Sequence, residues 1–415
     1  MTQDLYFQRF GFCGRQIATP APPDLGLAVV IPCFNEPDLI ESLESLWQCH
    51  RPGGAVEVIV VINSAATHSD AIRLQNESTY EEATQWAARH SEARFSFHLL
   101  HFPDLPPKQA GVGLARKIGM DEAARRFDDA RNSGGIIVCF DADCRCERNY
   151  LTSIERHFQE HPRSPGCSIY FEHPLTGADP QIDEAIAAYE LHLRYYVQAL
   201  RYAGFPYAHH TIGSSMAVRA DAYQKQGGMN KRQAGEDFYF LQKIISLGHF
   251  TDLTTTTVIP SPRPSERVPF GTGKAVCDYL DDPQIWSYPL EAFLDLKIFF
   301  EQLPELFRLK DVPPAKLPGS LPESIRTFLK SEIFAKAMGE IFENTSSEAA
   351  FRKRFFHWFN GFQAMKFIHY ARDHFYGKRS VREEAQKLLS LKGCGEANGA
   401  SVLELLAIYR RLDRT

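Results

Sequence analysis

The sequence feature that most constrains the fold is a series of short apolar runs that alternate with helical patterns. The runs cover residues 27–32, 56–62, 95–101 and 135–140. Such runs are typical of strands that are buried on both faces of a parallel sheet. Residues 37–48 and 112–127 carry helical patterns between them. This alternation predicts an α/β fold around a mostly parallel central sheet.

The chain becomes helical after a loop in its second half. Residues 261–274 are dense in proline, glycine and cations without periodicity, which predicts an ordered loop or a flexible lid. One further helical pattern, at residues 181–203, precedes this loop. The others follow it, at residues 281–309, 321–343, 347–375, 381–391 and 401–412. A domain usually has about 100 to 200 residues. We therefore expect two domains, an α/β domain at residues 1–275 and an α-helical domain at residues 276–415.

Composition excludes several classes of protein. The chain has 46 Lys and Arg, 51 Asp and Glu, a net charge of −5 and 44% apolar residues, a balance that excludes a disordered chain and an evenly basic nucleic-acid binder. Nine cysteines are too few for a disulfide scaffold, and Cys139, Cys144 and Cys146 lack the C-x-x-C spacing of a zinc site. We expect reduced thiols and a cytoplasmic protein. We find no signal peptide and no apolar run of the roughly 18 residues that cross a membrane.

Two aspartates follow the most apolar of the runs. Asp141 and Asp143 come directly after residues 135–140. In an open parallel sheet, ligands bind beyond the carboxyl ends of the strands. Two carboxylates one residue apart can share Mg²⁺ or Mn²⁺ there, directly or through water, and the cation would bridge to a substrate diphosphate. The alternative interpretation is a surface turn, where Asp is common.

A second acidic pair, Glu236 and Asp237, follows Gly235 and opens an apolar helical pattern at residues 238–247. One interpretation is a helix cap that complements the helix dipole, which is worth about 1 kcal/mol. The other is a general base that takes the proton of an attacking hydroxyl. We expect Asp237, rather than Glu236, to be that base.

Two groups of cations lie beside glycine turns. The first comprises Lys108, Arg116 and Lys117, around Gly111 and Gly113. The second comprises Arg263, Arg267 and Lys274, around Gly271 and Gly273. Singly, such cations are more often solvated surface charges. Together, cations and exposed backbone amides suit a diphosphate, so two such groups beside the aspartates favour an anionic leaving group.

The order of these motifs resembles that of family 2 glycosyltransferases of bacterial type, with the GT-A fold, over residues 25–275. VVIPCFNE (29–36) resembles the first strand and nucleotide-binding turn of the family, GVGLARKIGMDEA (111–123) its sugar-nucleotide helix, and DAD (141–143) its metal motif. HTIGSSMAVRADAYQKQGGM (210–229) resembles its acceptor-side segment, and GED (235–237) its catalytic-base motif.

The resemblance implies metal-dependent transfer of a sugar, of hexosyltransferase type, from a UDP- or GDP-sugar to a hydroxyl acceptor in glycan or glycolipid synthesis. It implies that Asp237 is the base of an in-line displacement that inverts the anomeric centre. The residues expected to bind the nucleotide sugar are Pro32, Asn35, Glu36, Asn63, Lys108, Gly113, Arg116, Asp141, Arg263, Arg267 and Lys274. Those expected on the acceptor side are Gly213, Ser214 and Ser215, and those expected at the metal are Asp141 and Asp143.

The sequence departs from the family pattern at two places. Asn63-Ser64 stands where the family usually has an acidic residue after the second strand, and residues 254–274 contain no His to serve as the third metal ligand that some relatives have. Arg267 or Lys274 is expected to offset diphosphate charge instead.

Two other functions fit parts of the sequence. A strand that ends in D-x-D also opens haloacid-dehalogenase-type phosphohydrolases, but there a Thr or Val normally follows, whereas Cys144 and Arg145 follow here. A sugar-binding protein with a degenerate glycosyltransferase fold is the non-catalytic alternative.

Residues 351–379 interleave aromatic residues with cations. The first interpretation is a buried helix core with a solvated basic face. The alternative is an interfacial helix that docks on anionic lipid at the inner face of the plasma membrane and brings the site to a lipid-linked acceptor.

Overall fold

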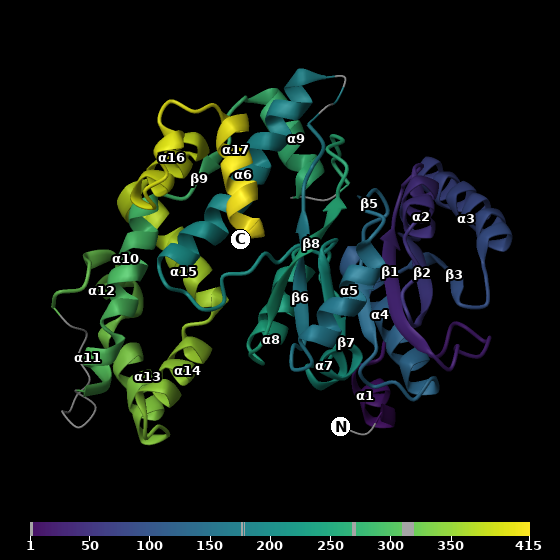
Figure 1. The fold of residues 1–415 in the computed structure, drawn as a ribbon, viewed down its shortest axis with the longest axis horizontal. Helices are drawn as coiled ribbons and strands as arrows, with labels where there is room; N and C mark the ends of the chain where they lie inside the picture. The colour runs from purple at the N-terminus through teal and green to yellow at the C-terminus, as the bar shows by residue number, and fades with distance from the viewer. Residues whose placement is uncertain (1–2, 176, 178, 268–270, 309–318) are drawn as a thin grey trace. The chain divides into compact units, whose positions relative to one another are not determined.

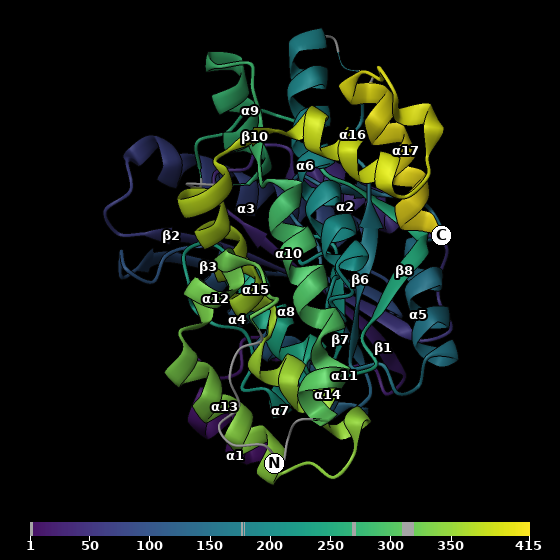
Figure 2. The ribbon, with the colours of Figure 1, turned by 90° about the vertical axis from the view of Figure 1, so that its left-hand side faces the viewer.

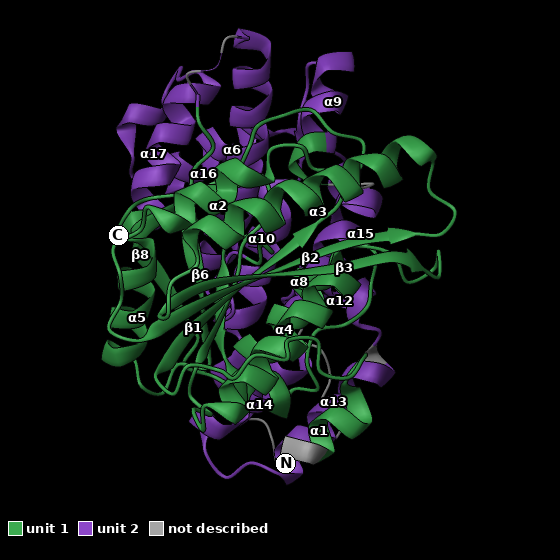
Figure 3. Ribbon diagram, turned by 90° about the vertical axis from the view of Figure 1, so that its right-hand side faces the viewer, with its two compact units in different colours: residues 1–174, 211–273, 414 green, residues 175–210, 274–413, 415 purple. Residues whose placement is uncertain are grey.

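The computed structural model describes residues 3–175, 177, 179–267, 271–308 and 319–415. The chain forms two compact units, each with contributions from separate parts of the sequence (Figure 3). Unit 1 comprises residues 1–174, 211–273 and 414, and unit 2 comprises residues 175–210, 274–413 and 415. Residues 175–210, which the sequence analysis assigned to the first domain, group with the C-terminal helices.

Unit 1 is built on an eight-stranded sheet with the strand order β3-β2-β1-β4-β7-β6-β8-β5 (Figure 1). The strands are β1 (Leu25–Cys33), β2 (Ala55–Ala65), β3 (Phe95–Leu105), β4 (Ile136–Cys139), β5 (Arg145–Cys146), β6 (Gly166–Phe171), β7 (Met216–Arg219) and β8 (Thr251–Ile259). Strands β3, β2, β1 and β4 are parallel neighbours, and β7 pairs antiparallel with both β4 and β6. The four strands expected from the apolar runs are confirmed.

Helices cover both faces of this sheet. Helices α2 (Leu39–Trp47) and α3 (Asp70–His90) lie on one face, and α4 (Val112–Asp129) lies on the other (Figure 3). The remaining helices of this unit are α1 (Gln3–Phe10), α5 (Tyr150–Glu160), α7 (Ala220–Lys225) and α8 (Glu236–Ile245). The β1 strand carries β2 on one side and β4 on the other. The carboxyl ends of β1 and β4 therefore meet at the point where ligands bind in open α/β sheets.

Unit 2 is helical, as expected for the C-terminal part of the chain. Its helices are α6 (Pro180–Tyr202), α10 (Leu290–Glu301), α11 (Leu303–Arg308), α12 (Glu323–Leu329), α13 (Ser331–Glu343), α14 (Glu348–Trp358), α15 (Gly361–Ala371), α16 (Val381–Leu391) and α17 (Val402–Arg414), and a π-helical turn covers Arg372–Tyr376. This unit also contains two short strands, β9 (Trp286–Ser287) and β10 (Arg379–Ser380), which pair antiparallel. Helix α16 packs along α6 (Figure 2). A core rich in phenylalanine fills the space between the helices.

The proline-rich segment after β8 is irregular at residues 261–267 and passes into α9 (Thr272–Asp281). Its residues 268–270 lie outside the described part of the chain. Lys274 lies in α9, in unit 2, where it forms an ion pair with Asp278. Within the described residues, no helix is both long enough and apolar enough to cross a membrane.

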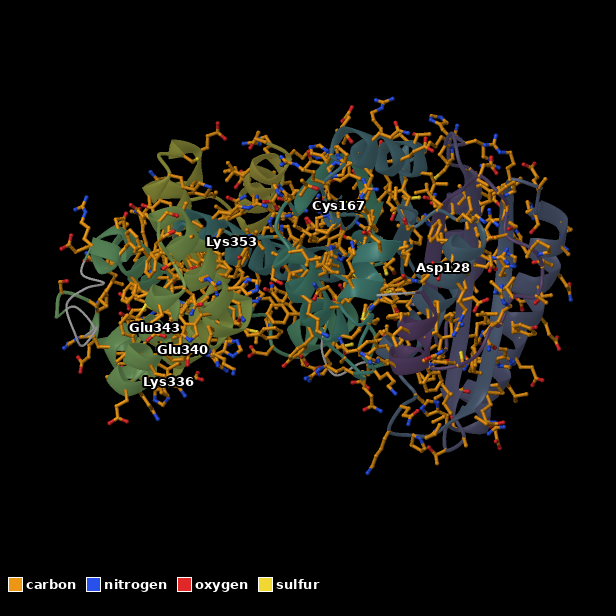
Figure 4. The ribbon with its side chains drawn as sticks, turned by 90° about the horizontal axis from the view of Figure 1, so that it is seen from below. Asp128, Cys167, Lys336, Glu340, Glu343 and Lys353 are labelled. Carbon is orange, nitrogen blue, oxygen red and sulfur yellow. The ribbon has the colours of Figure 1, made fainter. Side chains whose placement is uncertain are left out.

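The aromatic side chains at residues 351–379 largely form core. Phe351, Phe355 and Phe367 are fully buried, whereas Lys353, labelled in Figure 4, and Arg354 are exposed on α14. This is the arrangement expected of a buried helix core with a solvated basic face.

Candidate active site

The two aspartates after β4 lie on a turn that α2 holds in place. The Phe140 amide donates to the Val30 carbonyl at 3.1 Å, which continues the pairing of β4 with β1 as far as the turn. The Ser42 hydroxyl of α2 is 2.8 Å from the Ala142 carbonyl oxygen and 2.7 Å from that of Cys144. This serine was not among the expected site residues, because nothing in the local sequence links it to residues 141–144. The side chains of Asp141 and Asp143 are about one-third exposed, at 36% and 30%.

Arg116 joins the aspartate turn to the start of α8. It lies in the first part of α4 and is only 2% exposed. Its Nη2 donates to Asp141 Oδ1 at 2.7 Å, and its Nη1 pairs with the buried carboxylate of Glu236. Its Nε is buried and has no partner among the described residues. A buried guanidinium with two carboxylates fixes the relative positions of three motifs that are far apart in the sequence.

Gly213 lies directly against this guanidinium. A Cβ atom at this position would come within 2.7 Å of both Nη1 and Nη2 of Arg116. The Gly213 amide donates to Asp237 Oδ2 at 2.9 Å, and the Phe238 amide donates to Asp237 Oδ1 at 2.7 Å. Both oxygens of the half-buried Asp237 are therefore oriented by backbone groups. Burial raises the pKa of Asp237, and Arg116 opposes this effect only in part, so the carboxylate is a better proton acceptor than a free aspartate.

The two arginines after β8 converge on the turn after β1. Arg263 Nη2 and Arg267 Nη1 donate to Glu36 Oε2 at 2.6 and 2.7 Å. Arg263 also pairs with Asp38 at 2.7 Å, and Arg267 pairs with Asp143 at 3.4 Å. Burial alone would raise the pKa of Glu36, but the two arginines outweigh it and lower the pKa below its usual value. Glu36 is therefore an ionised anchor for both guanidinium groups.

The surroundings of Asp143 disfavour its negative charge. Burial, followed by the neighbouring charge of Asp141, raises the pKa of Asp143 to about 6, although Arg267 opposes the shift. A carboxylate in this state gains from a further positive charge. Within the described residues, no group of three or more His, Cys, Asp and Glu could hold a metal ion. Two carboxylates nonetheless suit Mg²⁺, which usually keeps several waters and takes its remaining ligands from substrate phosphates.

Helix α3 supports the turn after β1, a role that the sequence analysis missed. Asn35 has a positive φ of 48°, and its amide donates to Asn76 Oδ1 at 2.8 Å. The Thr79 hydroxyl donates to the Glu36 carbonyl at 3.0 Å. The buried Nδ2 of Asn76 has no partner among the described residues. Two buried polar side chains of α3 thus fix the backbone of the turn.

The start of α4, with Gly111 as its N-cap and Gly113 in its first turn, is packed against residues 232–233. A Cβ at Gly113 would lie 2.1 Å from the Arg232 carbonyl oxygen, and one at Gly111 would lie 3.1 Å from the Gln233 Cα. The Asn63 side chain, buried at the end of β2, donates to the Gly111 carbonyl at 3.1 Å. Residues 111–113 and 232–233 can therefore approach closely only because glycine occupies both of these positions.

The other expected site residues have varied surroundings. Lys108 is exposed, and Pro32 is buried in β1. Lys117 is buried against Asp121 at 3.1 Å, so it belongs to a structural ion pair and not to the site. Ser214 and Ser215 are buried as well, and of the three residues expected on the acceptor side, Gly213 donates its amide to Asp237. Lys274, in the other unit, is not placed relative to these residues.

Residues 28–227 match the model of the family described as glycosyl transferase family 2. Among solved structures, residues 1–349 of S. aureus TarS in complex with UDP-GlcNAc are 14% identical, with 94% of this chain and 90% of that chain covered and a TM-score of 0.38. The mannosyltransferase PcManGT from Pyrobaculum calidifontis in complex with GDP-Man and Mn²⁺ is 14% identical, with 99% and 94% covered and a TM-score of 0.35. The comparison with curated proteins gives no match.

The strand order of unit 1, the helices on both faces of its sheet and the family match over residues 28–227 agree with one another. The chain is a glycosyltransferase with a GT-A fold, and its residues 28–227 belong to glycosyl transferase family 2.

Proposed function

We propose that this chain transfers a hexose from a UDP- or GDP-sugar to an acceptor hydroxyl, with inversion at the anomeric carbon. The observation that carries the proposal is the ion-paired Arg116, which holds Asp141 beside the start of α8. Because of these ion pairs, the aspartate turn, where a diphosphate would bind, lies beside the start of α8, which would supply a general base.

The donor diphosphate would bind at the aspartate turn, between Asp143 and the two arginines of residues 261–267. Arg263 and Arg267 have Glu36 as their partner here, and a diphosphate offers the same kind of bidentate acceptor. Asp141 and Asp143 would hold Mg²⁺ or Mn²⁺, which would offset charge on the leaving diphosphate. The main chain of residues 32–36 would lie along the nucleoside.

Asp237 would be the base. Its carboxylate is oriented by the Gly213 and Phe238 amides, and its raised pKa suits removal of a proton from an acceptor hydroxyl. The hydroxyl oxygen would attack the anomeric carbon as the bond to the diphosphate breaks on the opposite side. Glu236 is buried against Arg116, so we assign it a positioning role.

Nucleotide release from UDP- and GDP-sugars, with Mg²⁺ or Mn²⁺ and with EDTA, tests this proposal. We expect slow donor hydrolysis that requires the metal. It should disappear in Asp143→Ala, while Asp237→Asn should retain donor binding and lose about 10²- to 10⁴-fold in hydrolysis, the usual contribution of a general base. Asp128→Asn is the matched control, because Asp128, labelled in Figure 4, lies in the last turn of α4, whereas Arg116 lies in its first part.

The absence of both turnover and donor binding in a folded protein would contradict the proposal. Donor binding without turnover would instead favour the non-catalytic sugar-binding alternative.

We further propose that the protein is cytoplasmic and that the exposed cations of α14 allow contact with an anionic membrane that carries a lipid-linked acceptor. The neighbouring phenylalanines are buried, so the contact would be electrostatic and would weaken with salt. Co-sedimentation with phosphatidylglycerol vesicles should fall when Arg352, Lys353 and Arg354 are changed to Glu. Unchanged binding would contradict this contact.

A further inference from the structure

Two thiols face each other beside the aspartate turn. Cys49 follows α2 and Cys146 lies in β5, and their Sγ atoms are 3.6 Å apart. Cys49 is 3% exposed, whereas Cys146 is partly exposed. The backbone holds both in place, since the Cys146 amide donates to Ser45 Oγ at 2.9 Å and the Cys49 thiol donates to the Ser45 carbonyl at 3.5 Å. With no third His, Cys, Asp or Glu close enough for a metal among the described residues, a metal–thiolate site is not the reason for this pair.

We propose that Cys49 and Cys146 are a modification site, at which a peroxide oxidises the two thiols to an intramolecular disulfide. A disulfide needs an S–S distance of about 2.0 Å. The sulfur atoms therefore have to approach by only about 1.6 Å, which small side-chain and backbone movements can supply.

The reaction balances with hydrogen peroxide as the oxidant. One thiol gives up its proton and attacks a peroxide oxygen as a thiolate, the O–O bond breaks, and the leaving hydroxide takes the proton, so that a sulfenic acid and water form. The second thiol then attacks the sulfenic sulfur, the S–O bond breaks and a second water leaves. Two thiols lose two electrons and two protons in total, and the peroxide gains them. The hydrogen bond with Cys146 lowers the pKa of Cys49, although burial opposes the shift, and a thiolate is the reactive form.

The disulfide would act on the aspartate turn. Cys146 is three residues beyond Asp143, and Ser42 and Ser45 of α2 hold the carbonyls of residues 142 and 144 and the amide of residue 146. A bond that draws Cys146 towards the end of α2 would shift this segment. This consequence rests on the proposed function of the turn in donor binding, whereas the disulfide itself does not.

Peptide mapping of the whole protein after hydrogen peroxide treatment tests the disulfide. Trypsin with a glutamyl endopeptidase isolates Cys49 in residues 45–57 and Cys146 in residues 146–147, because cleavage follows Glu44, Glu57, Arg145 and Glu147. We expect an intact mass lower by about 2 Da and a linked pair of these two fragments, which dithiothreitol separates. The linked pair should disappear in Cys49→Ser and in Cys146→Ser and persist in Cys13→Ser.

Oxygen additions without a linked pair, or a link of Cys146 to the fragment that contains Cys139 and Cys144, would overturn the proposed site. Donor hydrolysis and nucleotide binding are measured on the same oxidised samples. We expect both to fall on oxidation, to recover with dithiothreitol and to be unaffected by peroxide in Cys49→Ser. Unchanged binding in a sample shown to be linked would overturn the coupling to the turn. A protein inactive with every donor would still be judged by the peptide map.

Discussion

At the scale of single residues, the contact between Gly213 and Arg116 leaves no space for a Cβ atom. The guanidinium that Gly213 covers pairs with both Asp141 and Glu236, and the same glycine orients Asp237 through its amide. A side chain at position 213 would therefore disturb the donor side and the base together.

We predict that Gly213→Ala lowers the free energy of unfolding by about 1 to 3 kcal/mol, the usual cost of an overpacked site, and reduces transfer more strongly than donor binding. The reason is the 2.7 Å approach of the new Cβ to Arg116. Chemical denaturation measures the loss of stability, and donor titration together with nucleotide release compares the loss of binding with the loss of turnover. Gly134→Ala is the control, because its Cβ would meet no atom closer than 3.6 Å and should change little.

A buried histidine in unit 1 predicts how stability depends on pH. His157 is 6% exposed and its Nε2 lies 2.8 Å from Thr251 Oγ1. Burial, helped by His161, lowers the pKa of His157 to about 4 from 6.5. The native state therefore holds it neutral, and the unfolded chain binds the proton first as the pH falls.

The neutral His157 therefore contributes its full share to the free energy of unfolding above pH 6.5. This contribution is lost as the pH falls towards 4, and the loss reaches about 3 kcal/mol at pH 4. Urea denaturation between pH 7 and 4 should show the loss, and the slope should be smaller in His157→Gln. The exposed His50→Gln is the control. Equal slopes in all three proteins would contradict the assignment.

At the scale of elements, local sequence predicts the parallel half of the sheet and fails for the other half. Strands β1 to β4 contain apolar runs that the sequence shows directly, and Asp141 and Asp143 follow the fourth of these strands. Strands β6 and β8 were missed because they are short or rich in threonine, and α3 was missed because its inner face carries Asn76 and Thr79 where apolar residues would be expected. The convergence of Arg263 and Arg267 on Glu36 joins residues 227 and 231 positions apart, for which no local pattern exists.

One helix of unit 2 offers a stabilising substitution. Gly339 lies inside α13, and a Cβ there would meet no other atom within 4 Å. We predict that Gly339→Ala raises the free energy of unfolding by about 0.5 to 1 kcal/mol, since alanine loses less backbone entropy in a helix. Thermal denaturation measures the effect, and a lower melting temperature would contradict it.

At the scale of the whole molecule, the chain divides into two compact units, and we expect a change in the core of one unit to act mainly within that unit. In unit 2, α6 and α17 are joined by buried charges, with Arg194 between Glu190 at 2.8 Å and Asp413 at 2.6 Å. Burial alone would raise the pKa of Asp413, but His210 and Arg194 outweigh it and lower the pKa well below its usual value.

We predict that Asp413→Asn destabilises unit 2 by about 3 kcal/mol, because loss of one partner leaves a buried charge without full compensation. Hydrogen exchange should accelerate in α6 and α17 and remain unchanged in β1 and β2. Glu396→Gln is the control on an exposed pair with Arg411, which should cost at most about 1 kcal/mol. Equal acceleration in all helices and strands would contradict a local effect.

The close fit of Gly111 and Gly113 against Arg232 and Gln233 has a consequence for protein engineering. A larger residue at position 111 or 113 would fit only if residues 232 and 233 moved as well. A chimera that is meant to take the donor preference of a relative should therefore receive residues 108–117 and 230–237 together. If it received only one of the two segments, the segments would no longer fit against each other.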